Sequence, residues 1–377
     1  MKILLTTISL DPEQGGGTAA RTYNLARHLS RLGNDCTVAT IQGGEYARRL
    51  NTEGIATFAT GFWKLRFVVP QISPVKLAAE VRQADVVHIL GYWNILSVAT
   101  AFLASNIGTP YVLSAAGEFV GLEGPRTLHK RVFHRVFGRR MICHASRIIA
   151  VTPLEKEQII GRLGLSPEMI EVVSNGVEGP ATAVEYRHGA PVQQPYVLFV
   201  GRLAEVKGPD LLLEAFARVA TRNPDVSLVF GGPDFGMRLA LEAAAARHGL
   251  EDRVVFTGHL DEGGRSAAYS SALFLAVPSR SEAMSLVALE AGILGTPVLL
   301  TDRCGFDEVD AVGGGMVVPA TVEGLAGGLA TMLDQRATLS SQGRALQNYV
   351  ADHYAWPEVA RKLLSAIKGS RRTRTGG

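Results

Sequence analysis

Residues 196–221, YVLFVGRLAEVKGPDLLLEAFARVAT, contain the pattern that decides the fold. The apolar run Tyr196–Val200 has no polar alternation and stops at a glycine, as a fully buried strand of a parallel sheet does. The loop Gly201–Gly208 follows. Asp210–Thr221 then has helical periodicity behind Pro209, a residue that suits the first position of a helix. A buried strand, a turn and a helix are the repeating unit of an α/β protein.

The same unit recurs along the chain and predicts two doubly wound domains. Strands are expected at Ile3–Ile8, Cys36–Thr40, Ile55–Ala59, Val86–Leu90, Tyr111–Ser114, Ile148–Thr152 and Ile170–Val173, and then at Tyr196–Val200, Val226–Phe230, Val254–Phe256, Leu273–Val277, Val298–Leu300 and Met316–Val318. Helices are expected between them, among others at Thr18–Leu32, Asp210–Thr221, Gly236–Arg247, Ala283–Leu294 and Val322–Gln335.

Domain limits are predicted from a lapse in this pattern. Residues 178–194 are poor in large aliphatics and contain Pro180 and Pro191, which indicates a linker. We place an N-terminal domain at 1–186, a C-terminal domain at 187–351 and a disordered tail at 369–377. In such a pair of domains the ligand is expected in a cleft between them.

Composition excludes several classes of protein. Hydrophobic residues make up 47% and charged residues 19%, which argues against disorder, and a net charge of +3 is too small to indicate a nucleic-acid partner. Three scattered cysteines predict a reducing compartment and no structural zinc. The first apolar run is too short for a signal peptide, and no run approaches the roughly 20 residues of a membrane span. We expect a cytoplasmic protein.

The loop GRLAEVKG offers two cations directly after a buried strand. Ligands of open α/β sheets bind at this end of a strand. The planar fork of Arg202 and the compact charge of Lys207 together suit a diphosphate. The alternative is a surface loop with two solvated cations.

Two carboxylates stand in an E-x7-E spacing, Glu282 and Glu290. On a helix, eight residues rise about 12 Å and turn about 80° beyond two full turns. Carboxylates at that separation suit the two ends of an elongated ligand, each accepting hydrogen bonds from a diol, and are too distant to act as paired acid and base on one bond. The alternative is two exposed glutamates on an ordinary helix.

A glycine run, Gly15–Gly17, leads into the helix expected at Thr18 and offers backbone N–H groups to an anion. The dinucleotide fingerprint is met only loosely, because the loop is long and the second strand does not end in an acidic residue. No Asp-x-Asp and no cluster with metal-ligand spacing occurs in the sequence. A diphosphate leaving group would then be neutralised by protein cations, Arg202 and Lys207.

These motifs together resemble the retaining GT-B glycosyltransferases of family 4. The similarity rests on the glycine loop, DVVHILGYWN (85–94), SNGV (174–177), GRLAEVKG, VVFTGHL (254–260), PSRSEAMSLVALEAGILGTPV (278–298) and HYAWPEVARKLL (353–364). Their order over most of the chain makes the match specific. The resemblance implies a GT-B fold with two Rossmann-like domains and a C-terminal helix, 352–368, that packs back on the N-terminal domain.

The resemblance also assigns roles. Arg202 and Lys207 match the pair that holds the donor diphosphate, Glu282 matches the contact to the donor sugar, and Glu290 matches the contact to the ribose. The remaining donor contacts implied are Gly16, Gly17, Gly201, Ala283, Met284, Ser285 and Leu286. The resemblance implies a UDP-, GDP- or ADP-sugar as donor, a reaction that retains the anomeric configuration, and no requirement for a metal or cofactor. The expected acceptor is a sugar, with lipid-linked sugars and polysaccharide precursors as candidates.

Two departures from the family pattern concern the sugar end of the site. Many relatives carry a histidine after the strand that here is Tyr111–Ser114, where this chain has Ala115, Ala116, Gly117 and Glu118. Glu118 is one candidate for that catalytic role, and His88 is another. An exposed loop glutamate and a structural histidine are the alternatives. Ala283–Met284–Ser285 replaces the usual Gly-aromatic-Gly, so the sugar pocket is expected to differ.

A basic segment, 126–147, bears on the acceptor. Its cations are Arg126, Lys130, Arg131, Arg135, Arg139, Arg140 and Arg147, and it contains no acidic residue. A basic amphipathic helix suits an anionic membrane surface or a lipid diphosphate, so a peripheral location at the inner membrane face is one expectation. A core helix with a solvated basic face is the other.

Three rival functions use the same residues differently. A nucleotide-sugar epimerase rearranges its donor without an acceptor, and a catalytically silent nucleotide-sugar binding protein holds the donor unchanged. A Rossmann dehydrogenase is the third, and the second strand, which lacks the acidic residue, disfavours it. The base, the sugar, the acceptor and the oligomeric state are left open.

Overall fold

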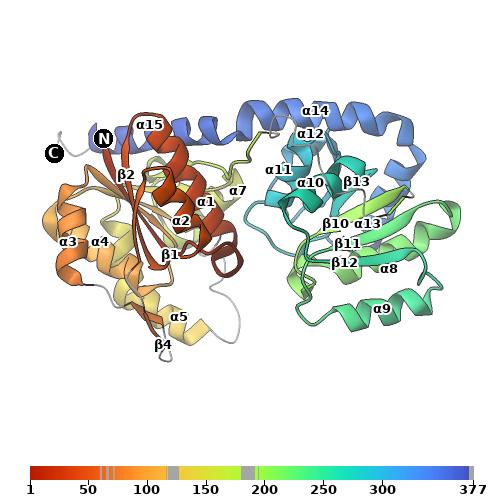
Figure 1. The fold of residues 1–377 in the computed structure, drawn as a ribbon, viewed down its shortest axis with the longest axis horizontal. Helices are drawn as coiled ribbons and strands as arrows, with labels where there is room; N and C mark the ends of the chain where they lie inside the picture. The colour runs from red at the N-terminus through yellow and green to blue at the C-terminus, as the bar shows by residue number, and fades with distance from the viewer. Residues whose placement is uncertain are drawn as a thin grey trace. The chain divides into compact units, whose positions relative to one another are not determined.

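The computed structural model describes residues 1–59, 62–64, 68–70, 73–115, 117, 127–179, 192–193 and 195–372. The chain forms two compact units. Unit 1 comprises Met1–Asn175 and Trp356–Gly377, and unit 2 comprises Gly176–Ala355. Each unit is a parallel sheet with helices packed on it (Figure 1).

Unit 1 contains a seven-stranded sheet in the order β3-β2-β1-β6-β7-β8-β9. Its strands are β1 (Lys2–Ser9), β2 (Asp35–Gln42), β3 (Ala56–Ala59), β6 (Val86–Leu90), β7 (Tyr111–Ser114), β8 (Arg147–Ala150) and β9 (Ile170–Val172). Every pairing in the sheet is parallel, and Leu5 of β1 lies opposite Val38 on one side and His88 on the other. The strand order reverses at β1, between β2 and β6.

The helices of unit 1 cover both faces of this sheet. They are α1 (Pro12–Arg31), α2 (Glu45–Thr52), α3 (Pro74–Gln83), α4 (Ile95–Ile107), α5 (Thr127–Phe133), the π-helical turn η2 (His134–Gly138), α6 (Arg139–Cys143), α7 (Pro153–Leu163), the short η3 (Pro167–Met169) and α15 (Trp356–Arg372). An antiparallel pair, β4 (Phe62–Lys64) and β5 (Val68–Pro70), was not predicted.

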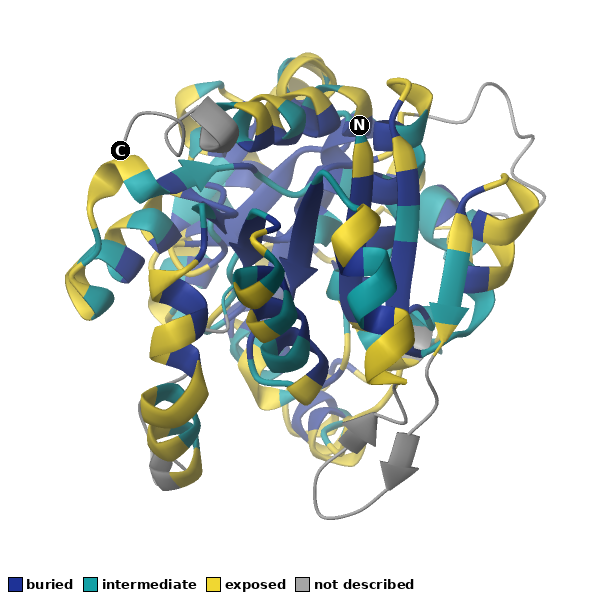
Figure 2. Ribbon diagram, turned by 90° about the vertical axis from the view of Figure 1, so that its left-hand side faces the viewer, coloured by how far each residue is buried: buried dark blue, intermediate teal, exposed yellow. Residues whose placement is uncertain are grey.

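Two apolar cores fill the space between these helices and the sheet. One packs α1 and α15 against β1 and β2, with Leu25 and Leu363 fully buried. The other packs α3 and α4 against the opposite face, with Leu77 and Leu96 fully buried. The strands of unit 1 are accordingly largely buried, while the helices around them have exposed outer sides (Figure 2). Burial on both faces explains why these strands lack polar alternation.

Unit 2 contains a six-stranded parallel sheet in the order β12-β11-β10-β13-β14-β15. Its strands are β10 (Tyr196–Val200), β11 (Ser227–Gly231), β12 (Val254–Gly258), β13 (Phe274–Val277), β14 (Val298–Thr301) and β15 (Gly315–Val318). Its helices are η4 (Glu205–Lys207), α8 (Pro209–Val219), η5 (Ala220–Arg222), α9 (Arg238–Arg247), α10 (Glu262–Ser271), α11 (Leu286–Ile293), α12 (Glu308–Ala311), α13 (Val322–Asp334) and α14 (Arg336–Tyr354). The strand order reverses at β10, between β11 and β13.

The predicted α/β fold is confirmed, and each predicted strand is present to within two residues at its ends. The unit boundary differs from the predicted 186/187. Val177 donates its N–H to the carbonyl oxygen of Tyr354 at 2.8 Å, which ties the segment from Gly176 to unit 2. The predicted linker falls mostly on 180–191 and 194, which lie outside the described residues.

The terminal helix also differs from the predicted 352–368. Ala355 has extended backbone angles, and it separates α14 from α15, in whose first turn Pro357 needs no hydrogen-bond acceptor. Helix α15 continues to Arg372, so residues 369–372 of the predicted tail are helical, and 373–377 lie outside the described residues. No helix in the described part of the chain combines the length and apolarity needed to cross a membrane.

Candidate functional site

The candidate site of unit 2 lies where the strand order reverses, after β10 and its neighbour β13. Ligands of open α/β sheets bind at such a switch point, outside the carboxyl ends of the strands. The loop after β10 and the loop after β13 are joined there by a hydrogen bond from the N–H of Arg280 to the carbonyl oxygen of Val206, 2.9 Å long. Only a glycine fits at position 208, where φ is +66°, because the β-carbon of any other residue would lie 2.1 Å from the carbonyl oxygen of Pro278.

Lys207 and Glu282 meet in this loop pair. The Lys207 ammonium donates to Oε1 of Glu282 over 2.8 Å, and the hydroxyl of Ser279 contacts the same oxygen. The Glu282 side chain is 9% exposed and that of Lys207 is 26% exposed. The carboxylate is thus held by two partners from two loops, while the ammonium keeps part of its surface for a further anion.

Arg202 is the second cation of the loop and is exposed. Its guanidinium carbon lies 5.2 Å from the ring centroid of Phe235, which is 58% exposed. The segment carrying Phe235 is fastened to the Arg202 loop, because the N–H of Phe235 donates to the carbonyl of Leu203 and the carboxylate of Asp234 accepts from three successive backbone N–H groups. Phe235 therefore supports the Arg202 side chain from one side.

A bidentate ion pair braces the same loops. The guanidinium of Arg280 donates to both carboxylate oxygens of Asp210, over 2.8 and 2.6 Å, and to the carbonyl oxygen of Glu205. Partial burial disfavours the Asp210 carboxylate, but the hydrogen bond and charge of Arg280 outweigh it and lower the Asp210 pKa. This pair ties the start of α8 to the loop that carries Glu282.

Glu290 lies on α11 and is one-third exposed. It accepts a hydrogen bond from the hydroxyl of Tyr269 at 3.0 Å and lies 3.7 Å from Nε of Arg265. The predicted helical geometry of the E-x7-E pair is wrong, because α11 begins at Leu286 and Glu282 belongs to the preceding loop. The calculated rise and rotation therefore do not apply to the two carboxylates.

The start of α11 has no side-chain cap. Ser285 precedes the helix and is fully buried, and its hydroxyl has no hydrogen-bond partner among the described residues. The first backbone N–H groups of a helix lack partners within the helix and attract anions. Met284 is also buried, and Ala283 and Leu286 are half-buried, so the four predicted donor contacts surround this helix start.

The glycine run of unit 1 is built differently from the prediction. Helix α1 already begins at Pro12 and is kinked at Gly16, whose φ and ψ of 50° and −137° are not helical. Gly16 and Gly17 are exposed. Gly15 packs closely, since a β-carbon there would lie 2.6 Å from that of Ala19. The kink leaves a glycine backbone at the carboxyl end of β1, the switch point of unit 1.

His88 is the third residue of β6 and has no exposed surface, so it lies inside unit 1 and not at an accessible strand end. Its Nε2 is 2.8 Å from the hydroxyl of Ser114, and Nδ1 has no partner among the described residues. Burial first, and the charge of Arg21 second, lower the His88 pKa to about 3. A neutral histidine with this burial cannot touch an acceptor. Glu118, the other candidate, lies outside the described residues.

Several supporting residues escaped the sequence analysis. Phe235 contacts the predicted Arg202 and Tyr269 contacts the predicted Glu290, from 33 and 21 positions away along the chain. Arg280 braces the loop of Glu282 through Asp210, which was not predicted and stands 70 positions away. Their only sequence signal was their place within five residues of a predicted strand. In the described part of the chain, no group of three or more histidine, cysteine or carboxylate side chains has the arrangement of a metal site.

Comparison with known proteins identifies the family of the chain. The family model described as Glycosyl transferases group 1 matches residues 183–349, and that described as Glycosyltransferase Family 4 matches residues 15–178. Together the two matches span most of both units, from residue 15 to residue 349.

Curated relatives include the D-inositol 3-phosphate glycosyltransferases of Gordonia bronchialis and Mycobacteroides abscessus. The first is 32% identical over 77% of this chain and 67% of the relative, and the second is 30% identical over 78% and 76%. The enzyme of that name from Kribbella flavida is 31% identical over 63% of this chain, and the match spans 60% of that relative's length.

Solved structures share the fold at lower identity. Anabaena Alr3699/HepE in complex with UDP and glucose has a TM-score of 0.76 at 19% identity, covering 98% of this chain and 100% of that one. WaaG, a glycosyltransferase involved in lipopolysaccharide biosynthesis, has a TM-score of 0.69 at 19% identity, covering 96% and 99%. The fold, the order of the motifs and the family matches agree, and the chain therefore belongs to the group 1, family 4 glycosyltransferases and has the GT-B fold.

Proposed function

We propose that the chain transfers a sugar from a nucleoside diphosphate sugar to an acceptor hydroxyl, with retention at the anomeric carbon and without a metal ion. The observation that carries the proposal is the Lys207–Glu282 contact at the β10 switch point. One exposed cation, one half-buried cation and one oriented carboxylate surround a position where α/β sheets bind ligands.

The diphosphate is assigned to Arg202, Lys207 and the start of α11. Arg202 offers a planar donor fork supported by Phe235, and Lys207 offers a point charge already oriented by Glu282. The uncapped N–H groups at Leu286 add a positive dipole. Together these groups would stabilise the charge that develops on the leaving diphosphate, the role a metal ion has in other transferases.

Glu282 and Glu290 are assigned to the two diols of the donor. Glu282 is held by Ser279 and Lys207 and would accept hydrogen bonds from the sugar, while Glu290, held by Tyr269, would accept from the ribose. Support comes from the Anabaena structures, which hold UDP with glucose in one case and UDP-glucose in another. UDP-, GDP- and ADP-sugars remain the candidate donors.

Retention follows if the acceptor attacks from the face that the diphosphate leaves. The bond between the anomeric carbon and the phosphate oxygen breaks, the acceptor oxygen bonds to the same face, and its proton passes to the departing phosphate oxygen. No enzyme base is needed in this scheme, which accords with the burial of His88. The acceptor is proposed to be a sugar or a cyclic polyol such as the substrates named for the curated relatives, and lipid-linked sugars and polysaccharide precursors stay candidates.

Thermal unfolding with UDP, GDP, ADP or NAD, each with EDTA present, tests the donor assignment. A ligand at about 100 times its dissociation constant adds roughly 2.7 kcal/mol to the free energy of unfolding. We expect one nucleoside diphosphate to raise the melting temperature of the wild type and to lose most of that effect in Arg202→Ala. Stabilisation by NAD alone, or by none of the four, contradicts the proposal.

Release of the nucleotide separates transfer from its rivals. A transferase frees one nucleoside diphosphate for each sugar moved to an acceptor. An epimerase converts the donor to an isomer without release, and a silent binding protein leaves the donor intact while still being stabilised by it.

A further inference from the structure

A second surface, on unit 1, combines exposed hydrocarbon with positive charge. It consists of helix α4 and the helical segment from His129 to His144, and we refer to it as the basic apolar face. Of the twelve large hydrophobic side chains exposed in the described residues, five lie on it: Ile95, Phe102, Val132, Val136 and Phe137. The loops that carry Arg202, Lys207 and Glu282 belong to unit 2.

The helical segment is fixed to unit 1 by its inner side. Gly138 is buried against Tyr92, so closely that a β-carbon at this position would lie 1.8 Å from the Tyr92 hydroxyl oxygen. That hydroxyl oxygen is 2.7 Å from Nδ1 of His134. Met141 and Ile142 are buried in the core beneath. The segment therefore packs on unit 1 through one side, and its other side chains are exposed to solvent. This holds for the π-helical turn His134–Gly138 and for the α-helical turns before and after it.

The cations follow one line on this face. Arg131, Arg135 and Arg139 are spaced by four residues and exposed, and no carboxylate pairs with them among the described residues. Four-residue spacing places side chains on one side of a helix. The segment 127–147 contains no acidic residue, and Arg147, which has its own pairing with Glu171, lies on β8 and not on the predicted helix.

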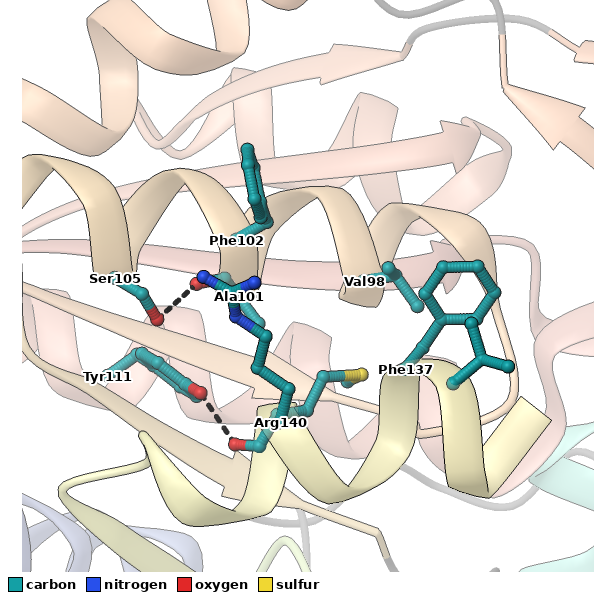
Figure 3. A pocket seen from close by; sticks show the side chains of 9 residues that line it. Val98, Ala101, Phe102, Ser105, Tyr111, Phe137 and Arg140 are labelled. Carbon is teal, nitrogen blue, oxygen red and sulfur yellow. Dashed lines mark hydrogen bonds between the residues drawn. The ribbon is translucent and has the colours of Figure 1, made fainter. Parts of the chain in front are cut away.

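A groove lies between the two helices of the face. It has a volume of about 210 Å³ and is lined mainly by apolar groups from α4 and from the segment 136–141. In Figure 3, Phe137 lies beside Val98, and Arg140 extends across the groove toward α4, where its guanidinium carbon is 5.4 Å from the ring centroid of Phe102. The volume is below the roughly 300 Å³ of ordinary small-molecule pockets, and it suits part of a hydrocarbon chain.

We propose that the basic apolar face docks on an anionic phospholipid bilayer, with the arginines at the headgroups and hydrocarbon in the groove between Phe102 and Phe137. Positive charge attracts an anionic leaflet, and exposed apolar side chains gain by entering the acyl boundary. A nucleic acid would satisfy the arginines but offer nothing to Val132, Val136 and the groove. The inference goes beyond the proposed transfer reaction and does not depend on it.

Vesicle flotation with the full chain tests this docking. The probes are vesicles of roughly one-third phosphatidylglycerol in phosphatidylcholine and vesicles of phosphatidylcholine alone, at about 0.05 M and about 0.5 M salt. We expect binding to the anionic vesicles at low salt and little binding in the other three conditions. The triple change Arg131→Gln, Arg135→Gln and Arg139→Gln should weaken partitioning roughly 100-fold.

Matched variants on unit 2 provide the controls. Arg222→Gln, Arg247→Gln and Arg344→Gln together remove three exposed arginines from unit 2 and should leave partitioning unchanged. Val136→Ser should weaken partitioning to the anionic vesicles roughly 5-fold. Leu239→Ser is its control, because the Leu239 side chain is 81% exposed on unit 2, and it should leave partitioning unchanged.

Three outcomes overturn the proposal: no binding of the wild type to anionic vesicles at low salt, an equal loss in the two triple variants, or equally tight binding of duplex DNA at the same salt. A preserved melting shift with the stabilising nucleotide shows that each variant is folded. It also separates this result from any failure of the donor site.

Discussion

Both units place charged side chains beside the carboxyl ends of parallel strands, but they treat the charge in opposite ways. In unit 1, Arg21 is 2% exposed and donates to the carbonyl oxygens of Val173 and Ser174, and Glu155, also 2% exposed, accepts from the N–H groups of Val151 and Gly117. In unit 2 the cations of the loop after β10 are accessible to solvent: Arg202 is exposed and Lys207 is partly exposed.

The comparison separates charges that hold backbone from charges that can hold a ligand. Burial lowers the pKa of Arg21 to about 10, with the charge of Glu155 opposing the shift, and burial raises the pKa of Glu155. Such groups are already committed to hydrogen bonds that a ligand cannot replace. Lys207, a quarter exposed, retains donors for a further partner. Residue type and position after a strand are thus not enough to identify a ligand-binding residue. Its burial must also be known.

The largest effect is expected where the buried charge of unit 1 is removed. Arg21→Met leaves the carbonyls of Val173 and Ser174 without donors and should lower the free energy of unfolding by about 3 kcal/mol or more. Urea denaturation measures this. Arg31→Met, an exposed position on the same helix, should change it by less than about 0.5 kcal/mol. Normal stability with lost nucleotide binding would place Arg21 among the ligand-binding charges and break the comparison.

Removing the carboxylate of unit 2 should affect the reaction more than the fold. Glu282→Gln keeps a side chain that hydrogen bonds to Ser279 and Lys207 but loses the negative charge. We expect the transfer rate to fall roughly 100-fold, a size typical of a lost electrostatic contact in a transition state, with a small change in melting temperature. Glu205→Gln, an exposed glutamate three residues from Arg202, should retain the wild-type rate. Equal rates in both variants would remove Glu282 from the site.

The buried histidine of unit 1 predicts a pH dependence of stability. The His88 pKa is about 3 in the fold and about 6.5 in the unfolded chain, so between these values the unfolded state binds one proton more. Stability therefore rises with pH across this window, and it is lost on acidification from about 6.5 at up to about 1.4 kcal/mol per pH unit.

His88→Gln should flatten that slope. Urea denaturation at about pH 6.5, 5.5 and 4.5 measures the slope, and His259→Gln, at an exposed histidine of unit 2, serves as the control. An unchanged slope in His88→Gln would mean that other groups of the chain govern its acid sensitivity.

The smallest effect concerns the support of Arg202. A cation–π contact at an exposed site contributes about 0.5–1 kcal/mol. Phe235→Leu should therefore raise the KM for the donor roughly 2- to 5-fold with little change in kcat, and Phe235→Tyr should restore it. In an Arg202→Gln background the effect of Phe235→Leu should vanish. Persistence of the effect would show that Phe235 acts on the donor by another route.

The sequence predicted the strands well because burial on both faces leaves an uninterrupted apolar run. Val86–Leu90, Tyr111–Ser114 and Tyr196–Val200 are found with the predicted bounds. The helix predicted at Ala283–Leu294 begins three residues later, at Leu286. Ala283 and Met284 suit a helix, but the N–H groups of Glu282 and Ser285 are bonded to the carbonyls of Arg303 and Cys304. That tertiary contact, 21 and 19 residues away, has no local signal.

Placement of the candidate site was predictable to the loop but not to the side chain. The strand end marked Arg202 and Lys207, and the spacing of motifs marked Glu282 and Glu290. His88 differs from these residues in being buried. Its burial results from the pairing of β6 with β1 and β7, which the local sequence does not reveal. The supports Phe235 and Tyr269 were missed for the same reason.

The return of α15 to unit 1 has a consequence for synthesis on the ribosome. Its side chains Trp356, Val359, Leu363 and Ile367 complete the core shared with α1, although unit 2 is translated between the two segments of unit 1. Chains fold as they emerge, and domains generally fold as units. Unit 2 is contiguous in sequence and can fold first. Unit 1 keeps an uncovered apolar face until α15 has left the exit tunnel. We expect nascent chains that stop at Ala355 to bind chaperones through that uncovered face.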